Sequence, residues 1–133
     1  MAKIFYGDPH KSGSSSIPLS KAVRAGDFIY VSGQTANDDN GGIITGNIED
    51  QTNLIMNNIC KILKETGCEI EDIIKTTVWL SDARDFGRFN NCYAKFFKNN
   101  KPARSTTVCD LVVDAKISLR SQQLGGLYGL QGL

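Results

Sequence analysis

The segment from Asn47 to Gly67 constrains the fold most, because it carries the pattern of one long amphipathic helix. Residues of one face recur at steps of three and four: Ile48, Thr52, Ile55, Met56, Ile59, Ile62 and Leu63. Asn47 can cap the first turn with its side chain, and Gly67 is placed to end the helix. The periodicity therefore predicts a helix between these two residues, with one face in the core.

Runs of apolar and β-branched residues predict the strands. Gly26 and Asp27 form a turn signal before a short strand at 28–31, which ends near Gly33. The polar turn NDDNGG precedes 43–45, which we expect to form a bent hairpin arm. The run IIKTTVWL at 73–80 predicts a strand that is buried on both faces or lies at an interface.

A second helix is predicted to open at Asp82 or Asp85 and to stop before Pro102. Its aromatic residues form one stripe, which is typical of a core-facing surface rather than of a cofactor site: Phe86, Phe89, Tyr93, Phe96 and Phe97. After Pro102 we expect a strand at 104–111, a turn at 112–115 and a last strand at 116–121.

This order of elements predicts an α/β or α+β domain with a mixed sheet and both helices on one face. No third helix is available to cover the other face, so oligomerisation is the natural cover. We assign residues 1–121 to a single domain. Residues 122–133, QQLGGLYGLQGL, are interpreted as a Gly/Leu-rich extension that is flexible or lies against a partner.

Composition limits the functions to consider. The formal net charge is +1, with 15 basic and 14 acidic residues, which does not favour binding to nucleic acid. There is no apolar run of about 20 residues and no signal-peptide pattern at the N-terminus, so we expect a cytosolic protein without a membrane span.

The four cysteines form no C-x-x-C pair, and His10 is the single histidine, so no metal centre is expected. Cys60 and Cys92 fall at apolar helix positions and are interpreted as small core residues with reduced thiols.

The stretch KPARST at 101–106 places a permanently charged guanidinium, Arg104, at the start of a predicted strand. An unpaired buried charge costs several kcal/mol or more, which makes a carboxylate partner necessary. That carboxylate is either internal, in a surface or inter-subunit salt bridge, or external, on a bound ligand.

Four strings occur together and in a specific order: V-S-G-Q at 31–34, K-T-T-V-W-L at 75–80, F-N-N-C-Y-A-K-F-F at 89–97 and P-A-R-S at 102–105. With them, about residues 17–120 resemble the reactive-intermediate deaminase family, the Rid or YjgF family of small trimeric proteins. The resemblance implies a chorismate-mutase-like fold and a homotrimer with clefts between subunits. It also implies cofactor-free hydrolysis of enamines and imines such as 2-aminoacrylate and 2-iminopropanoate.

Carried over by position, the resemblance makes Arg104 the residue that binds the substrate carboxylate, a task suited to a planar guanidinium. It places Ser32, Gly33 and Asn90 at the substrate. Two of these have other readings from the residues alone: Ser32 can be satisfied by local backbone, and Asn90 can contact a neighbouring subunit.

Three positions depart from the family pattern. Thr106 replaces a cysteine, and its hydroxyl can still form a hydrogen bond. Leu19 replaces a tyrosine, which makes the mouth of the cleft more apolar and points to a different or bulkier substrate. Ser118 replaces the glutamate that orients water, and a serine is a poor base near neutral pH. Asp110 and Asp114 are candidate replacements, although turn aspartates are more often solvated caps.

Two functions therefore stay open at this stage. The first is an imine/enamine deaminase with an altered pocket, in which Arg104 and Ser118 occupy the catalytic positions. The second is a non-catalytic trimer that binds small carboxylates. An older family label, endoribonuclease or translation inhibitor, finds no support in the near-neutral charge.

Overall fold

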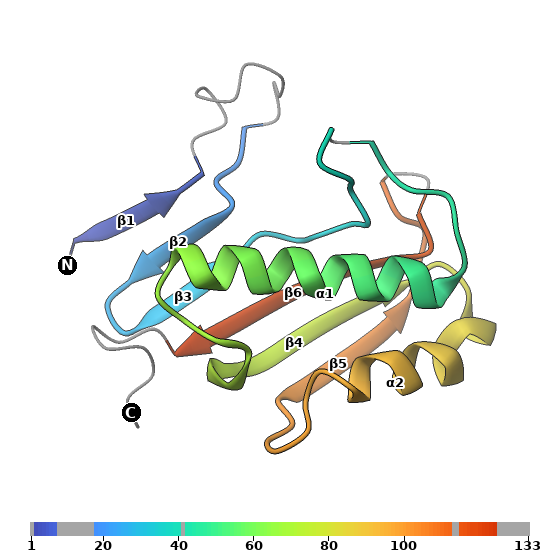
Figure 1. The fold of residues 1–133 in the computed structure, drawn as a ribbon. Coiled ribbons are helices and arrows are strands. Elements are labelled where there is room, and N and C mark those ends of the chain that lie inside the picture. Colours follow the sequence, from blue (N-terminus) through green and yellow to red (C-terminus); the bar gives the residue numbers. More distant parts are fainter. Residues whose placement is uncertain (1, 8–17, 41, 113–114, 125–133) are drawn as a thin grey trace.

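The computed structural model describes residues 2–7, 18–40, 42–112 and 115–124 (Figure 1). Two α-helices, two 3-10 turns and six strands follow one another: β1 (Lys3–Tyr6), β2 (Ala22–Ala25), β3 (Phe28–Val31), α1 (Ile48–Glu65), η1 (Ile70–Asp72), β4 (Ile73–Leu80), η2 (Ala83–Asp85), α2 (Phe86–Ala94), β5 (Ala103–Val108) and β6 (Ile117–Leu124).

The six strands form one mixed sheet in the order β1-β2-β3-β6-β4-β5. Only the β4–β5 pair is parallel among these neighbours, and α2 provides the crossover between the two strands. Both α-helices lie on the same face of the sheet (Figure 1). The predicted α+β arrangement, with a mixed sheet and two helices on one face, is confirmed.

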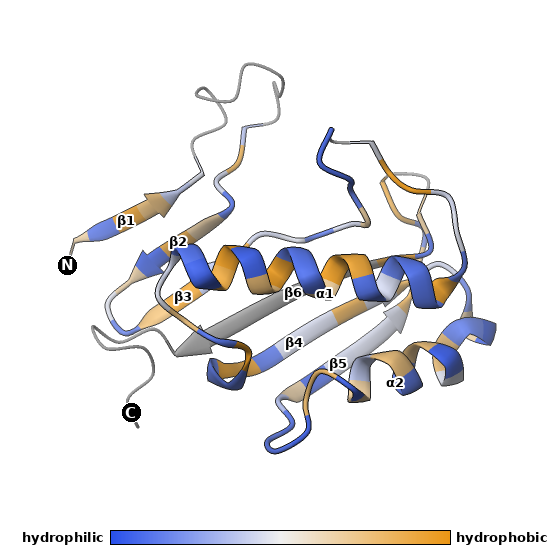
Figure 2. Cartoon of the chain, viewed as in Figure 1, coloured by the Kyte–Doolittle hydropathy of each residue, from blue (hydrophilic) through white to orange (hydrophobic). Residues whose placement is uncertain are grey.

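Helix α1 matches its sequence pattern closely. The Asn47 side chain accepts a hydrogen bond from the Asp50 amide at 2.8 Å, and Gly67 takes a left-handed φ of 81° just after the helix. Every residue of the predicted face is buried. Hydrophobic and hydrophilic residues alternate along α1, as expected of an amphipathic helix (Figure 2). The strands supply the opposite side of this core with Ile29, Val78, Leu80, Ile117 and Leu119.

The start of the second helix combines the two predicted options. The Asp82 side chain accepts a hydrogen bond from the Arg84 amide and so caps η2, and α2 begins one residue after Asp85. The predicted aromatic stripe is core only in part. Phe89, Tyr93 and Phe97 are buried, Phe96 is half-buried, and Phe86 remains 45% exposed.

Several predicted strands need correction. β1 and β2 were not predicted from the sequence. The arm expected at 43–45 is reduced to an isolated bridge between Asn37 and Ile43. β5 ends at Val108 rather than at residue 111, and β6 continues to Leu124, three residues past the expected end at Ser121.

Strand β4 is buried on one face only within this chain. Thr76, Val78 and Leu80 are buried beneath the helices, whereas Ile74 is 40% exposed and Trp79 is half-buried. Of the two predicted alternatives, burial on both faces is wrong for the single chain. The other alternative, that the uncovered face lies at an interface, stays a prediction.

The remainder of the extension, residues 125–133, lies outside the described residues.

The cysteines differ in their surroundings. Cys68 and Cys92 are buried, Cys109 is exposed, and Cys60 is only half-buried, so its interpretation as a core residue is wrong. All four are free thiols.

No group of three or more potential metal ligands occurs in the part of the chain that the structure describes, which does not include His10. None of the described helices is long and apolar enough to cross a membrane.

Candidate functional site

Arg104 lies on β5 beneath helix α2, and its guanidinium is surrounded by aromatic rings. The guanidinium carbon is 5.0 Å from the ring centre of Tyr93, 5.4 Å from that of Phe89 and 5.7 Å from that of Phe86. Ring faces attract cations at such distances, but they carry no net charge. Among the described residues Arg104 has no ion-pair partner, so its charge is not neutralised within this part of the chain.

The aromatic residues are held by contacts with the sheet and with one another. Thr76 on β4 is the register partner of Arg104, and its hydroxyl lies 2.8 Å from that of Tyr93. Tyr93 packs between Phe89, at 5.3 Å between ring centres, and Phe97, at 4.7 Å. Burial raises the pKa of Tyr93, while the Thr76 hydrogen bond and the Arg104 charge act in the opposite direction. The phenol is therefore neutral and provides no counterion for Arg104.

Two buried polar groups near these aromatic rings have no hydrogen-bond partner among the described residues. They are the side-chain oxygens Oγ1 of Thr106 and Oδ1 of Asn90. Thr106 follows Arg104 by two residues on β5, which places both on the helix-covered face of the strand. Asn90 lies one helical turn after Phe86 and shares its face of α2. Buried oxygens without partners are rare, and here they point to a polar ligand.

The predicted residues of the V-S-G-Q turn lie elsewhere. The Ser32 hydroxyl donates to the Ser20 carbonyl at 2.5 Å, so backbone does satisfy it, although that backbone belongs to the segment before β2 and is not local in sequence. Gly33 is exposed, and Leu19, next to Ser20, is 47% exposed. The Gln34 main chain pairs with Leu119 of β6, so this group borders β6. Strands β6 and β4 lie between β3 and β5, so the V-S-G-Q turn and Arg104 are far apart within a single chain.

Ser118 also belongs to a different part of the sheet. Its register partner on β4 is Trp79, whereas the partner of Arg104 is Thr76. Because successive strand positions alternate between faces, these two rows belong to opposite faces of the sheet. The position of Ser118 is therefore on the face that the helices leave uncovered. Of the alternative acids, Asp110 is exposed beyond β5 and Asp114 lies outside the described residues.

The structure thus brings together Arg104, Thr106 and Asn90, and it separates them from Ser32, Gly33, Leu19 and Ser118. The sequence reading missed the ring contacts of Phe86, Phe89 and Tyr93 with Arg104, since it treated the aromatic stripe as core alone. The spacing of these rings marked a helix face, but nothing in the sequence indicated that β5 would carry an arginine against it.

Fold and site together define a small α+β protein in which Arg104 has no counterion among the described residues. The family model described as Endoribonuclease L-PSP matches residues 11–119. The chain is 34% identical over 111 residues to a human 2-iminobutanoate/2-iminopropanoate deaminase, with 82% of this chain and 81% of that protein covered. The chain belongs to this family, which includes the reactive-intermediate deaminases and is also called the Rid or YjgF family.

Other relatives support the same assignment. A RutC family protein of Pyrococcus abyssi is 42% identical over 88 residues, which cover 65% of this chain and 69% of that protein. A Rid-family protein of unknown function from Yersinia pestis superposes with a TM-score of 0.84 at 30% identity, covering 92% of this chain and 99% of that one.

Proposed function

We propose that this protein hydrolyses reactive enamines and imines of small carboxylic acids, such as 2-aminoacrylate and 2-iminopropanoate, to 2-oxo acids and ammonia. One observation carries the proposal: Arg104 has no counterion among the described residues and stands beside two buried oxygens without partners. A substrate carboxylate would accept paired hydrogen bonds from the guanidinium and neutralise it. The human relative named a 2-iminobutanoate/2-iminopropanoate deaminase supports the choice of substrate class.

The site is completed by a second copy of the chain in this proposal. Arg104 and the V-S-G-Q turn lie at different places along the sheet, and the face opposite the helices leaves Ile74, Phe28 and Tyr30 exposed. A homotrimer packed through that face would cover it and form three clefts between subunits. Because β5 is an edge strand of the sheet, Ser32, Gly33 and Leu19 of the next copy would approach Arg104, Asn90 and Thr106 at that edge.

The reaction needs no redox partner. The enamine takes a proton at C3 to give the imine, and water then adds to the C2 carbon of the protonated C=N bond. The resulting carbinolamine expels ammonia as the new C=O bond forms, so water supplies the oxygen and the nitrogen leaves with its bonding electrons. Arg104 contributes by orienting the substrate, because a carboxylate held by the guanidinium keeps the imine carbon in one place for the attack of water.

Water activation is where this chain differs from the family pattern. A serine at position 118 replaces the expected glutamate, and loss of a general base costs on the order of a hundred- to ten-thousandfold in rate. An imine is already activated toward water, so we expect turnover to continue at a reduced rate through positioning.

The test is a coupled assay in which a serine/threonine dehydratase generates 2-iminopropanoate and its disappearance is followed with and without this protein. We expect faster decay with the wild-type chain, and decay at the uncatalysed rate with Arg104→Ala. Arg104→Lys is the matched control, because it keeps the charge but not the two-pronged geometry, and we expect it to recover part of the rate. Identical decay with and without wild-type protein, across several amino-acid-derived imines, would contradict the proposal.

The serine at position 118 favours a second function, a trimeric protein that binds small carboxylates without turnover. Calorimetry separates the two. A binding heat for 2-oxobutanoate that disappears in Arg104→Ala, together with no acceleration of imine decay, would establish the binding function in place of the enzymatic one.

A further inference from the structure

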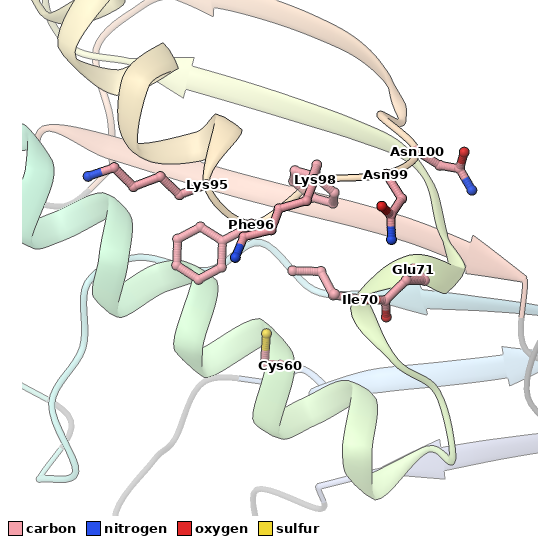
Figure 3. Close-up of a pocket in the computed structure, with 9 residues that line it drawn as sticks. Cys60, Ile70, Glu71, Lys95, Phe96, Lys98, Asn99 and Asn100 are labelled. Carbon is pink, nitrogen blue, oxygen red and sulfur yellow. The ribbon is translucent and has the colours of Figure 1, made fainter.

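A pocket distinct from the Arg104 site opens between α1, η1 and the segment that follows α2. Its volume is about 310 Å³, at the small end of the range for ligand pockets. Cys60 of α1, Ile70 and Glu71 of η1, and residues 95–100 line it (Figure 3). It exists because α1 places the short side chain of Cys60 opposite Phe96, beside the fully buried stripe that includes Met56 and Ile59.

The lining has an apolar part and a cationic part. Ile70, Phe96 and Phe97 provide apolar surface, and the Cys60 sulfur points toward the segment that carries Phe96 and Lys98 (Figure 3). The Lys98 side chain extends back across the pocket toward Phe96, and Asn99 directs its amide toward Ile70 and Glu71, whereas Lys95 points outward (Figure 3). Lys98 forms no ion pair with any of the described residues.

We propose that this pocket binds a small carboxylate that carries an apolar chain or ring. The carboxylate accepts hydrogen bonds from the Lys98 ammonium, and the apolar part packs on Ile70 and Phe96. Glu71 determines the orientation, because its negative charge repels a carboxylate from the η1 end of the pocket. This site does not depend on the deaminase reaction, and neither Arg104 nor Thr106 lines it.

Cys60 provides a local reporter of occupancy. Burial, and secondarily the charge of Glu71, raise the pKa of the Cys60 thiol. Alkylation of Cys60 by iodoacetamide is therefore slow, and its rate is best measured at about pH 9. Cys109, the residue after β5, is exposed and does not line the pocket, so it serves as the internal control. Mass spectrometry of peptides from the full-length protein gives the alkylation rate at each cysteine.

The experiment uses 3-phenylpropanoate as the probe and 3-phenylpropanamide as its uncharged counterpart, in wild-type protein and in Arg104→Ala. We expect the acid to slow alkylation of Cys60 but not of Cys109, equally in both proteins, and the amide to protect far less. Lys98→Met should raise the concentration of acid that halves the alkylation rate of Cys60 by about three- to tenfold. This is the loss of affinity expected for an interaction between an exposed ion pair and a hydrogen bond to a charged group in strength. Lys95→Met, whose side chain points outward, is the matched control and should change it little.

A second measurement does not depend on thiol chemistry. Calorimetric titration of Arg104→Ala with 3-phenylpropanoate should show binding that is lost when Cys60→Leu narrows the pocket in the same background. Three results would overturn the proposal: no protection and no heat, equal protection by acid and amide, or protection that vanishes in Arg104→Ala. The last would assign the effect to the Arg104 site.

Discussion

The hydroxyl groups of Tyr93 and Thr76 lie 2.8 Å apart beneath helix α2, and Thr76 is the register partner of Arg104. This buried contact joins α2, which supplies the aromatic rings, to β4, the strand beside Arg104. Both residues are almost fully buried, so neither hydroxyl has water as an alternative partner. The hydrogen bond thus helps to hold the aromatic rings over Arg104, together with the contacts among the rings.

Removing either hydroxyl alone should destabilise the fold. Tyr93→Phe leaves the Thr76 hydroxyl buried without its partner, and Thr76→Val does the same to Tyr93, each at a cost of about 1–2 kcal/mol. The double variant should cost clearly less than the sum, because it leaves no orphaned group. Urea unfolding of the four proteins measures this, and strictly additive losses would show that the contact contributes nothing.

Thr106→Val should have opposite effects on stability and on binding. Valine has nearly the shape of threonine, and it removes a buried hydroxyl that has no partner, so we expect the unliganded protein to gain up to about 1 kcal/mol. If the hydroxyl bonds to the ligand carboxylate, the affinity for 2-oxobutanoate should fall about three- to tenfold. Unfolding curves and calorimetry give the two numbers. Unchanged affinity would remove Thr106 from the site.

Alanine substitution at two exposed glycines, Gly67 and Gly87, should show how backbone conformation alone affects the stability of the fold. A Cβ at Gly67 or at Gly87 would meet nothing within 4 Å, so packing does not distinguish the two positions. Gly67 has a φ of 81° after α1, and Gly67→Ala should cost about 1–2 kcal/mol. Gly87 lies within α2 without a positive φ, and Gly87→Ala should instead stabilise by up to about 1 kcal/mol. Thermal unfolding that shifts both variants in the same direction would contradict this assignment.

Asp82 should contribute a defined part of the acid dependence of stability. Side-chain hydrogen bonds from Arg84 lower the pKa of Asp82 from 3.8 to about 2. Because Asp82 binds its proton at a higher pH in the unfolded chain than in the folded one, ionised Asp82 stabilises the fold. This contribution is complete above about pH 4 and is lost as the pH falls toward 2. Asp82→Asn keeps a capping side chain but has no titrating group, so its stability should fall less between pH 5 and pH 3. Urea unfolding at both pH values checks this, with Asp27→Asn as a control for the loss of a surface carboxylate.

Restoring the family glutamate should raise the rate. If positioning alone supports turnover in the wild-type chain, Ser118→Glu should accelerate 2-iminopropanoate decay about a hundredfold or more, by supplying the base that orients water. Ser118→Gln, which has nearly the same size without the charge, is the control. Equal rates for the two variants would mean that position 118 does not face the reacting carbon.

Much of the fold could be read from local patterns. The helix between Asn47 and Gly67 has its cap, its stripe and its stop in consecutive residues, and all three appear in the structure. The strands β1 and β2 were not predicted in this way. Their position depends on pairing, since β1 pairs with β2 across a long segment of chain and β2 pairs with β3. The end of β6 depends on β3 and β4, which offer hydrogen bonds as far as Leu124 and Gln123.

For the site, the sequence alone indicated that a carboxylate partner should be sought, because P-A-R-S places a guanidinium at the start of a predicted strand. What surrounds that charge depends on the tertiary structure. The parallel crossover from β4 through α2 to β5 places Phe86, Phe89 and Tyr93 over Arg104. It leaves the side-chain oxygens of Asn90 and Thr106 without a hydrogen-bond partner among the described residues, and the register puts position 118 on the other face of the sheet. These relations depend on strand order and register, which arise from contacts between residues far apart in the chain.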